Sequence, residues 1–497
     1  MSPWLPILLS IILVGLITIL LKKPASKLPP GPRSLPIIGN LHMLGSLPHR
    51  ALHQLSKLHG PIMHLKLGLV PTVVVSSADA AKLFLKTHDA VFCSRPKTQT
   101  SEVLSYGGKG MAFSEYGPHW RSMRKLCTLE LLTNAKVEMF GAMRSEEVRR
   151  AVEEMRGGRD HDHEEELLVD LTCRVDKLVE DMTVKMIFGS GGSVEFRRIV
   201  DEALKMAGAF NLNDFVPFLK VLDLQGLGRR MKRVSKELDA LFNQIIDEHM
   251  RRAKEKQGNH KDFIDILISL MESDNTNDMQ LDRDMIKALL LDLLAAGLDS
   301  TATTVIWAFA ELMKRPFTMK KAQEELKDVI GLHRMVEEKD LVNLEYLNMV
   351  IKETLRLHPV APLLVPRESI QDVIVNDYHI PKKTRLIINA WAIGRDPKAW
   401  SGDPEEFDPG RFANSDVDLS GRYFELIPFG AGRRGCPGLL MGLRSVQLVL
   451  GQLLHCFDWE LPKGVSPCDL DMGEKFGLAV ARAKHLFIKP TYRLKIT

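Results

Sequence analysis

The spacing of apolar residues along the chain predicts much of its secondary structure. Between residues 439 and 453, apolar side chains recur every three or four positions, as in a helix with one buried face. Residues 282–315 form a longer helical candidate that stops before a proline and has an aspartate near its start for capping. Residues 62–67 alternate in polarity and residues 71–76 are rich in β-branched side chains, so the two stretches are predicted to form a hairpin.

The first 21 residues contain no charged side chain and are almost continuously apolar from Trp4. This run is long enough to cross a hydrocarbon core of about 30 Å, and Lys22 and Lys23 follow at once. The positive-inside rule then places the rest of the chain on the cytosolic side. A cleavable signal peptide is the alternative, but its charge would precede a shorter apolar run.

Residues 22–33 include the string Pro29-Pro30-Gly31-Pro32, in which consecutive prolines favour a stiff, extended segment over a helix. We expect a hinge that holds the body at an angle to the membrane, with an ordinary linker as the alternative. The predicted organisation is an anchor at 1–21, a hinge at 22–33 and one body at 34–497.

Composition excludes several classes of protein. Hydrophobic residues make up 45% and charged residues 26%, which is ordinary for a globular protein and excludes a disordered one. The net charge of +4 is too balanced to favour nucleic acid as a partner. The six cysteines lack short paired spacings, which argues against a disulfide framework and a zinc site. Residues 160–164 combine histidines with acids, but we expect a solvated loop there instead of a metal site.

The glycine-rich stretch 429–438 contains the principal candidate for chemistry, Cys436. It precedes the helix predicted from 439, and the positive end of a helix lowers the pKa of a nearby thiol. We therefore expect Cys436 to ionise easily and to serve as a metal ligand or a nucleophile, while the glycines admit a large flat group. A buried free cysteine is the alternative.

These ten residues resemble the haem-binding signature of the cytochrome P450 superfamily, with Phe429, Gly432, Arg434, Cys436 and Gly438 in their expected places. The resemblance implies haem b as the cofactor and Cys436 as the axial ligand of its iron. It also implies a mainly α fold with a small β-rich part, in place of the several domains that length alone suggests.

Four residues are implied to meet the haem propionates. Trp120 and Arg124 are four positions apart, hence on one helix face, and they match the family's Trp-x-x-x-Arg element. Arg367 ends an apolar, proline-stiffened passage that the family places over the haem, and Arg434 is a further candidate. Simple packing of Trp120 on Arg124, and a solvated charge at Arg367, are the alternatives.

The helix predicted at 282–315 carries the counterpart of the family's oxygen-activating element. Asp299 matches it, Ser300 stands where threonine is usual, and Thr301 follows. The resemblance implies that these three residues manage protons on the face of the haem opposite the cysteine. We expect Gly297 to leave room for a ligand lying across the helix. The alternative is that the hydroxyls are satisfied within a core helix.

Glu353 and Arg356 are adjacent on a predicted helix surface and match the family's Glu-x-x-Arg motif. The resemblance adds Arg411 and so predicts a buried, structural ion cluster. Gly410 stands where the family usually has glutamate.

The closest resemblance is to plant membrane-bound members of the superfamily. It implies a monooxygenase in the endoplasmic reticulum membrane that inserts one oxygen atom of O2 into a small lipophilic terpenoid or phenolic, with electrons from NADPH through a reductase. A reductase-independent hydroperoxide isomerase or dehydratase, or a non-catalytic haem-binding protein, are the alternatives. By the same resemblance, the substrate pocket would be lined by Phe210, Leu294, Ala295, Leu364, Leu478 and Ala479.

Overall fold

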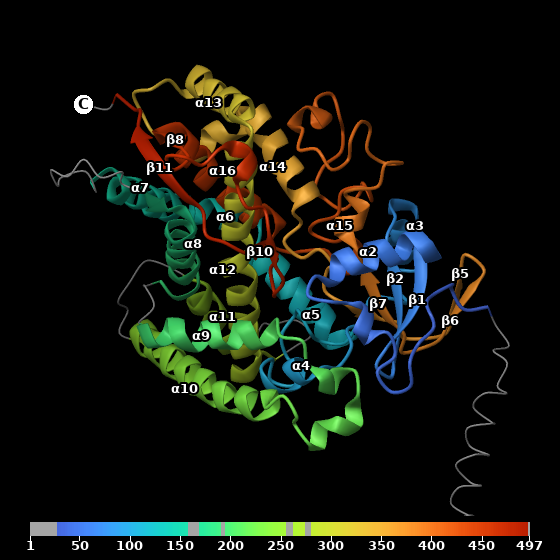
Figure 1. Cartoon of the computed structure of the whole chain (residues 1–497). Helices are drawn as coiled ribbons and strands as arrows, with labels where there is room; N and C mark the ends of the chain where they lie inside the picture. The colour runs from blue at the N-terminus through green and yellow to red at the C-terminus, as the bar shows by residue number, and fades with distance from the viewer. Residues whose placement is uncertain (1–26, 158–167, 190–193, 255–261, 274–279, 496–497) are drawn as a thin grey trace, which may run out of the picture.

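Helix α12 (Arg283–Lys314) runs through the middle of the molecule, and the other helices surround it (Figure 1). The computed structural model describes residues 27–157, 168–189, 194–254, 262–273 and 280–495. The Asp282 side chain caps α12 by accepting a hydrogen bond of 2.7 Å from the Met285 amide. The helix ends just before Pro316, so the helix predicted at 282–315 is confirmed.

The other long helices pack around α12, and short helical segments lie between them. They are α2 (Pro48–His59), α5 (Pro118–Leu126), α7 (Gly141–Gly157), α8 (Leu171–Phe188), α9 (Val194–Ala207), α10 (Leu227–Lys254), α11 (Phe263–Glu272), α13 (Pro316–Ile330), α14 (Glu345–Leu357) and α16 (Leu439–Cys456). The shorter ones are α3 (Ala78–Lys82), α4 (Gln99–Val103), α6 (Asn134–Met139) and α15 (Ala390–Ile393).

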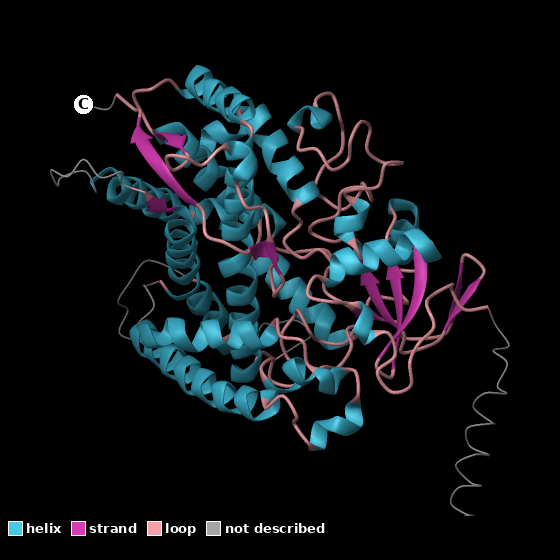
Figure 2. Cartoon of the chain, in the orientation of Figure 1, coloured by secondary structure: helices cyan, strands magenta, loops and turns pink. Residues whose placement is uncertain are grey.

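The largest sheet lies at one side of the molecule (Figure 2) and has the strand order β1-β2-β7-β4. Its first two strands, β1 (Ile62–Leu67) and β2 (Val70–Val75), pair antiparallel and confirm the predicted hairpin. Strand β7 (Arg385–Ile388) runs parallel to β2, and β4 (Arg367–Glu368) pairs antiparallel with β7. The sheet thus joins the beginning of the body to its last third.

The smaller sheets tie the C-terminal part of the chain to the helices. One has the order β3-β11-β8, from β3 (Val169–Asp170), β11 (Phe487–Tyr492) and β8 (Phe457–Glu460). The two remaining pairs are β5 (Val373–Val375) with β6 (Tyr378–Ile380), and β9 (Glu474–Lys475) with β10 (Ala481–Arg482).

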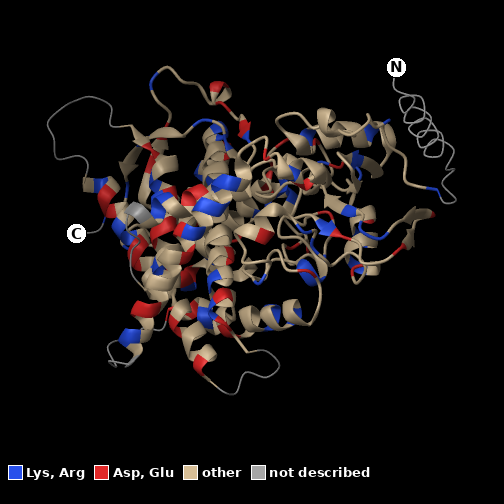
Figure 3. Ribbon diagram, turned by 90° about the horizontal axis from the view of Figure 1, so that it is seen from below, with Lys and Arg blue, Asp and Glu red and all other residues tan. Residues whose placement is uncertain are grey.

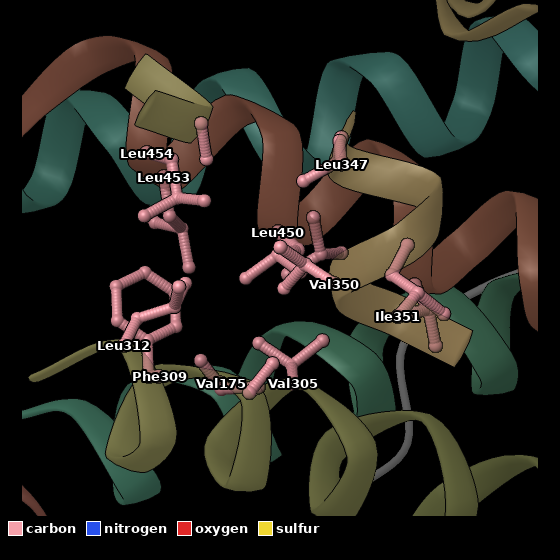
Figure 4. Close-up of a cluster of buried hydrophobic side chains, with 14 of the residues drawn as sticks. Val175, Val305, Phe309, Leu312, Leu347, Val350, Ile351, Leu450, Leu453 and Leu454 are labelled. Carbon is pink, nitrogen blue, oxygen red and sulfur yellow. The ribbon is translucent and has the colours of Figure 1, made fainter. Parts of the chain in front are cut away.

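The main core forms where α8, α12, α14 and α16 meet. Figure 4 shows Val175 of α8 and Val305 of α12 close to one another, with Val350 of α14 and Leu450 of α16 facing them. All of these side chains are buried. The mainly helical fold class with a small β-rich part is therefore confirmed.

Acidic and basic residues are interspersed over the outer helices in Figure 3, in keeping with the small net charge. Ion pairs between neighbouring helices, such as Arg150 of α7 with Asp181 of α8 at 2.9 Å, use many of them.

The membrane anchor predicted at 1–21 lies outside the described residues, as does the acidic and histidine-rich loop at 160–164. Within the described residues, α12 and α16 are apolar and long enough to cross a membrane, but both are mostly buried inside the protein. The described end of the predicted hinge packs closely on β1, because a Cβ at Gly31 would lie 1.9 Å from the carbonyl oxygen of His64.

Candidate functional site

The loop that carries Cys436 is closed by a backbone hydrogen bond and leads directly into α16. The Cys436 amide donates to the Phe429 carbonyl at 2.9 Å, and α16 begins three residues later at Leu439. Gly432 has a φ of +69°, and a Cβ there would lie 2.4 Å from the carbonyl oxygen of Leu85. A side chain at Gly432 would therefore collide with backbone.

Cys436 is an exposed residue, although protein atoms crowd around its thiol. This crowding raises the pKa of the thiol, and the Gly438 amide and the Arg124 charge only partly oppose it. The expectation that the helix end alone acidifies Cys436 is wrong, because loss of hydration outweighs the nearby positive charge. An accessible thiol of this kind ionises when a metal cation binds it.

Arg434, two residues before the cysteine, is a buried cation held only by neutral groups. Its guanidinium donates to the carbonyl oxygens of Cys93 at 2.7 Å, Met111 at 3.2 Å and Ser114 at 2.6 Å. It also lies 4.1 Å from the ring centroid of Trp120. Burial lowers the pKa of Arg434, as expected for a charge without a counter-ion.

Trp120 and Arg124 address the same loop from α5, as their spacing predicts. The Trp120 side chain is buried beneath the Arg434 guanidinium. The Arg124 guanidinium donates to the Gly435 carbonyl at 2.7 Å, immediately before Cys436. Burial is also the main cause that lowers the pKa of Arg124.

Arg95 is a further buried cation that the sequence analysis did not identify. It donates to the carbonyl oxygens of Ala112 at 3.1 Å, Val365 at 2.5 Å and Pro366 at 2.8 Å. Burial and the neighbouring charge of Arg434 lower its pKa. Arg95 lies in a loop, so no periodic pattern in the sequence predicts its burial. Only its position next to a proline could have drawn attention to it.

Arg367 differs from these three arginines because it has an acidic partner. Its guanidinium donates to Asp89 at 2.9 Å and to the Ala431 carbonyl at 2.6 Å. The other carboxylate oxygen of Asp89 accepts from the Arg433 guanidinium at 2.8 Å. The charge of Arg367 is therefore already balanced within the protein.

The donor set around Cys436 fits a haem. Among the described residues, the buried Arg95 and Arg434 and the half-buried Arg124 have no carboxylate partner, and unpaired cations shielded from water are costly unless a counter-ion binds. A haem b supplies two carboxylates for such cations and an iron for a thiol. Ala296, in the middle of the otherwise mostly buried α12, is also exposed, which leaves that face accessible.

On α12 the hydroxyl groups of Ser300, one of the predicted residues, and of Thr304 bond back to the helix. Ser300 donates to the Ala296 carbonyl at 2.7 Å, and Thr304 donates to the Ser300 carbonyl at 2.8 Å. Thr301 is buried, whereas Asp299 is half-buried. Burial, followed by the charge of Asp201, raises the pKa of Asp299 and so favours its protonated form.

Gly297 does not have the role that we expected from the sequence. A Cβ at this position would lie 2.8 Å from the Thr183 side chain of α8. The missing side chain therefore allows close packing of α8 on α12, and the room it leaves is filled by protein.

The three residues of the predicted ion cluster lie together in the structure. Arg356 donates to both carboxylate oxygens of Glu353, at 2.6 and 2.7 Å, and Arg411 lies 3.3 Å from the same carboxylate. Glu353 and Arg356 have fully buried side chains. The Asp408 amide also donates to Glu353 at 2.7 Å, so the Glu353 carboxylate joins α14 to the segment around Arg411.

The residues suggested as pocket walls are placed differently from one another. A Cβ at Gly208, after α9, would lie 2.5 Å from the Leu478 amide, so this end of α9 touches the 477–478 segment. Leu294 is fully buried among the helices, and Ala295 and Leu364 are partly buried. Phe210 is 52% exposed and stacks on Phe215, so it lies on the outer surface. The assignment of these residues to a pocket stays a prediction.

An exposed cysteine just before α16, with Arg124 and Arg434 bonded beside it, suits a haem held through a thiolate. The sequence profile described as "Cytochrome P450" matches residues 29–487. The chain belongs to the cytochrome P450 family, and the predicted membership, monooxygenase class and haem cofactor are confirmed.

Three relatives illustrate how far the similarity extends. "Cytochrome P450 CYP736A12" of Panax ginseng is 52% identical over 94% of each chain. The 5-epiaristolochene 1,3-dihydroxylase of Nicotiana tabacum is 42% identical over 94% of this chain and 93% of its own. A zebra fish cytochrome P450 structure with abiraterone matches 90% of this chain and all of its own, with a TM-score of 0.73 and 26% identity.

Proposed function

We propose that the protein is a membrane-bound monooxygenase that hydroxylates a small lipophilic specialised metabolite, a terpenoid or a phenolic, with electrons from NADPH through a reductase. The observation that carries the proposal is the exposed Cys436 beside the buried Arg95 and Arg434 and the half-buried Arg124, which lack acidic partners among the described residues. Together these groups provide a ligand for iron and counter-charges for carboxylates.

The haem, when bound, supplies an iron that activates dioxygen, and a thiolate ligand favours cleavage of the O–O bond. Cys436 would hold the iron. Arg95, Arg124 and Arg434 would hold the propionates, with Arg367 as a fourth candidate beside its partner Asp89. Phe429 and Gly438 would shape the loop around the cysteine, whose amide bonds to the Phe429 carbonyl.

Proton management would fall to the middle of α12. Burial raises the pKa of Asp299, so its carboxyl holds a proton more readily than an exposed aspartate and can pass it to a neighbour. The Ser300 hydroxyl can turn from the Ala296 carbonyl toward the accessible face of the helix, because this single bond is local and exchangeable. Thr301 is buried and would act as support for this turn.

The substrate would lie against apolar walls formed by Ala295, Leu364, Leu478 and Ala479, with Leu294 behind them. These side chains favour a ligand of low polarity. One relative is a dihydroxylase of 5-epiaristolochene, which agrees with an apolar substrate of moderate size. Incubating the protein and a reductase with a mixed plant metabolite extract, and identifying the oxygenated products, would determine the substrate class.

An exposed apolar face supports attachment to the endoplasmic reticulum membrane. The turn between β1 and β2 contacts two segments at once: the Gly68 amide donates to Ile38 at 3.1 Å, and the Leu69 amide donates to Phe215 at 2.8 Å. Both segments expose large apolar side chains near these contacts, and such a patch suits a lipid surface. They are Leu35, Ile37, Ile38, Phe218, Val221, Leu222 and Leu224.

The reductase would dock on the face near the cysteine loop. Lys125 is exposed on α5, next to Arg124, and the Arg433 side chain is 47% exposed in the loop itself. These cations suit an acidic partner surface, and the interaction should weaken with salt. Electron delivery through this face is therefore expected to depend on ionic strength.

Replacing Cys436 with serine tests the ligand assignment. We expect the variant to lose the thiolate-type absorption of the ferrous carbonyl complex. Cys468→Ser, at an exposed cysteine elsewhere, should keep it. A thiolate-type spectrum that survives in Cys436→Ser would refute the assignment.

The electron source separates the proposed activity from its alternatives. Product formation that requires NADPH, reductase and O2 supports a monooxygenase. Conversion of a hydroperoxide without reductase would instead show an isomerase or dehydratase, and tight haem binding without any product would show a non-catalytic protein. Ser300→Ala should raise the share of NADPH consumed without product, because the hydroxyl that positions protons is lost.

A further inference from the structure

A cysteine, a histidine and an aspartate meet at the start of α8, away from the Cys436 loop. Asp170 is the N-cap of α8, and Cys173 lies in the first turn of the helix. His485 comes from the segment just before β11. Because β3 and β11 pair antiparallel, with Asp170 opposite Phe487, the sheet brings together residues more than 300 positions apart.

The backbone holds this meeting point firmly. The Leu171 amide donates to the Leu486 carbonyl at 2.9 Å, and the Leu486 amide donates to the Thr172 hydroxyl at 3.0 Å. These bonds flank the three side chains on both chain segments. The donor atoms therefore sit on a sheet edge and a helix start, not on a free loop.

The donor atoms lie close enough together to surround one small cation after a small adjustment. The Nδ1 atom of His485 lies 2.7 Å from an Asp170 carboxylate oxygen and 3.9 Å from the Cys173 sulfur. All three ligand atoms lie within 4.8 Å of one another. Ligand atoms of a tetrahedral zinc ion are separated by roughly 3.3–3.8 Å, given bond lengths of about 2.0–2.3 Å. Shifts of less than about 1 Å would bring the donors into that range.

We propose that Asp170, Cys173 and His485 form a binding site for a zinc-like divalent cation, with water as the fourth ligand. Thiolate, imidazole and carboxylate are the ligands that zinc prefers, and they do not suit magnesium. Cys173 is exposed and the His485 side chain is 50% exposed, so a hydrated cation can enter. The second oxygen of Asp170 can keep its 3.0 Å cap on the Cys173 amide.

A second group of possible ligands consists of His249, Asp262 and Asp265. Its contacts indicate a structural role instead of metal binding. Both ring nitrogens of His249 are engaged, with the Ile245 carbonyl at 2.8 Å and with Asp262 at 3.1 Å. The other oxygen of Asp262 accepts from the Asp265 amide at 2.8 Å. This group contains no thiol and is largely buried, so its atoms serve to join α10 to α11.

A cation at the proposed site would fasten the start of α8 to β11. Since α8 packs along α12, the fastening would support the helix that carries Asp299 and Ser300. A ligand that binds the folded state more tightly than the unfolded chain raises the stability of the fold by mass action. The site is independent of the oxygenation proposed above, so the two can be tested separately.

The test uses the full-length, haem-loaded protein after treatment with a chelator. Cadmium titration should produce one saturable thiolate-to-metal charge-transfer band in the ultraviolet, and equilibrium dialysis should show that zinc competes for the same site. Zinc, but not magnesium, should raise the thermal unfolding midpoint. Cys173→Ser and His485→Ala should each weaken zinc binding at least about tenfold.

Two further variants keep the result interpretable. Cys468→Ser removes an exposed thiol elsewhere and should leave binding unchanged. Asp170→Asn retains a good helix cap but removes the charge, so it should weaken binding without unfolding α8. If His485→Ala loses the haem spectrum, Cys173→Ser and Asp170→Asn decide. Equal zinc binding by the natural protein and Cys173→Ser would overturn the proposal, as would loss of binding in Cys468→Ser.

Discussion

Two groups of buried arginines in this protein have opposite charge balance. Around Glu353, the guanidinium of Arg356 makes two hydrogen bonds to one fully buried carboxylate, and Arg411 approaches the same group. Around Cys436, Arg434 and Arg95 are bonded only to backbone carbonyls. The first group is complete within the chain, whereas the second lacks its anions.

This difference separates a structural network from a binding site made of the same residue type. A buried arginine that is paired inside the chain has its charge compensated, so removal of either partner destabilises the fold. A buried arginine without an acid costs free energy until a ligand supplies the negative charge. Arg367 shares a property with each group. It lies near the Cys436 loop, but Asp89 balances its charge.

The largest effect is expected from Glu353→Gln, which leaves the buried Arg356 without its charge partner. Removing one partner of a buried pair typically costs about 3–5 kcal/mol. Urea unfolding of the haem-loaded protein would measure the loss. Glu324→Gln, at an exposed pair on α13, is the control and should leave the unfolding midpoint unchanged. Equal stability of Glu353→Gln and the natural protein would show that this cluster is not structural.

Asp89→Asn should convert Arg367 from the paired to the unpaired kind. The carboxamide keeps an acceptor but loses the charge, so we expect a stability loss of about 1–3 kcal/mol. Because an unpaired Arg367 becomes available to a propionate, haem retention should not fall. The free energy of unfolding checks the predicted loss of stability. The rate of haem transfer to an acceptor protein checks the predicted haem retention. Faster haem loss in this variant would contradict our distinction between the two groups.

Arg434→Gln should affect haem binding more than the fold. The residue supplies a counter-charge two positions from the iron ligand, and losing such a supporting contact typically costs about 10–100-fold in affinity. The rate of haem transfer to an acceptor would report the change. Arg149→Gln, at an exposed arginine paired with acids on α7, should transfer haem at the natural rate.

Arg95→Gln should show the same behaviour to a smaller degree, about tenfold at most. Its three carbonyl contacts come from two loops, so part of its effect is to hold those loops together. Measuring the rate of haem transfer from Arg95→Gln and Arg434→Gln side by side would rank the two arginines by their contribution to haem binding. An Arg95→Gln variant that loses stability but keeps its haem would move Arg95 into the structural group.

Local patterns were sufficient to predict the elements that carry the site. The Asp282 cap, the hairpin at 62–75 and the start of α16 behind Cys436 all follow from spacing and turn residues. Such features depend on neighbours in the sequence, and periodicity reports them directly. The resemblance to a family added the roles of Trp120 and Arg124, which spacing alone could not assign.

Contacts between distant segments were not predictable in the same way. The pairing of Asp89 with Arg367, the packing of Thr183 on Gly297 and the approach of Cys173 to His485 all depend on how elements dock. The raised pKa of Cys436 has the same origin, because desolvation comes from the surrounding fold. The spacing of the cysteines argued against a zinc site. That spacing cannot report a histidine, such as His485, that the fold brings next to a cysteine from a distant part of the chain.

The burial of α12 has a consequence for biosynthesis. This helix reaches a mean hydropathy of 1.5, and its neighbours in the fold shield it from water. One of them, α16, begins at Leu439, so α12 leaves the ribosome long before its cover is complete. Slow or faulty assembly therefore leads to misinsertion or aggregation. Cellular yield should consequently respond to core substitutions more steeply than the melting temperature of the purified protein does.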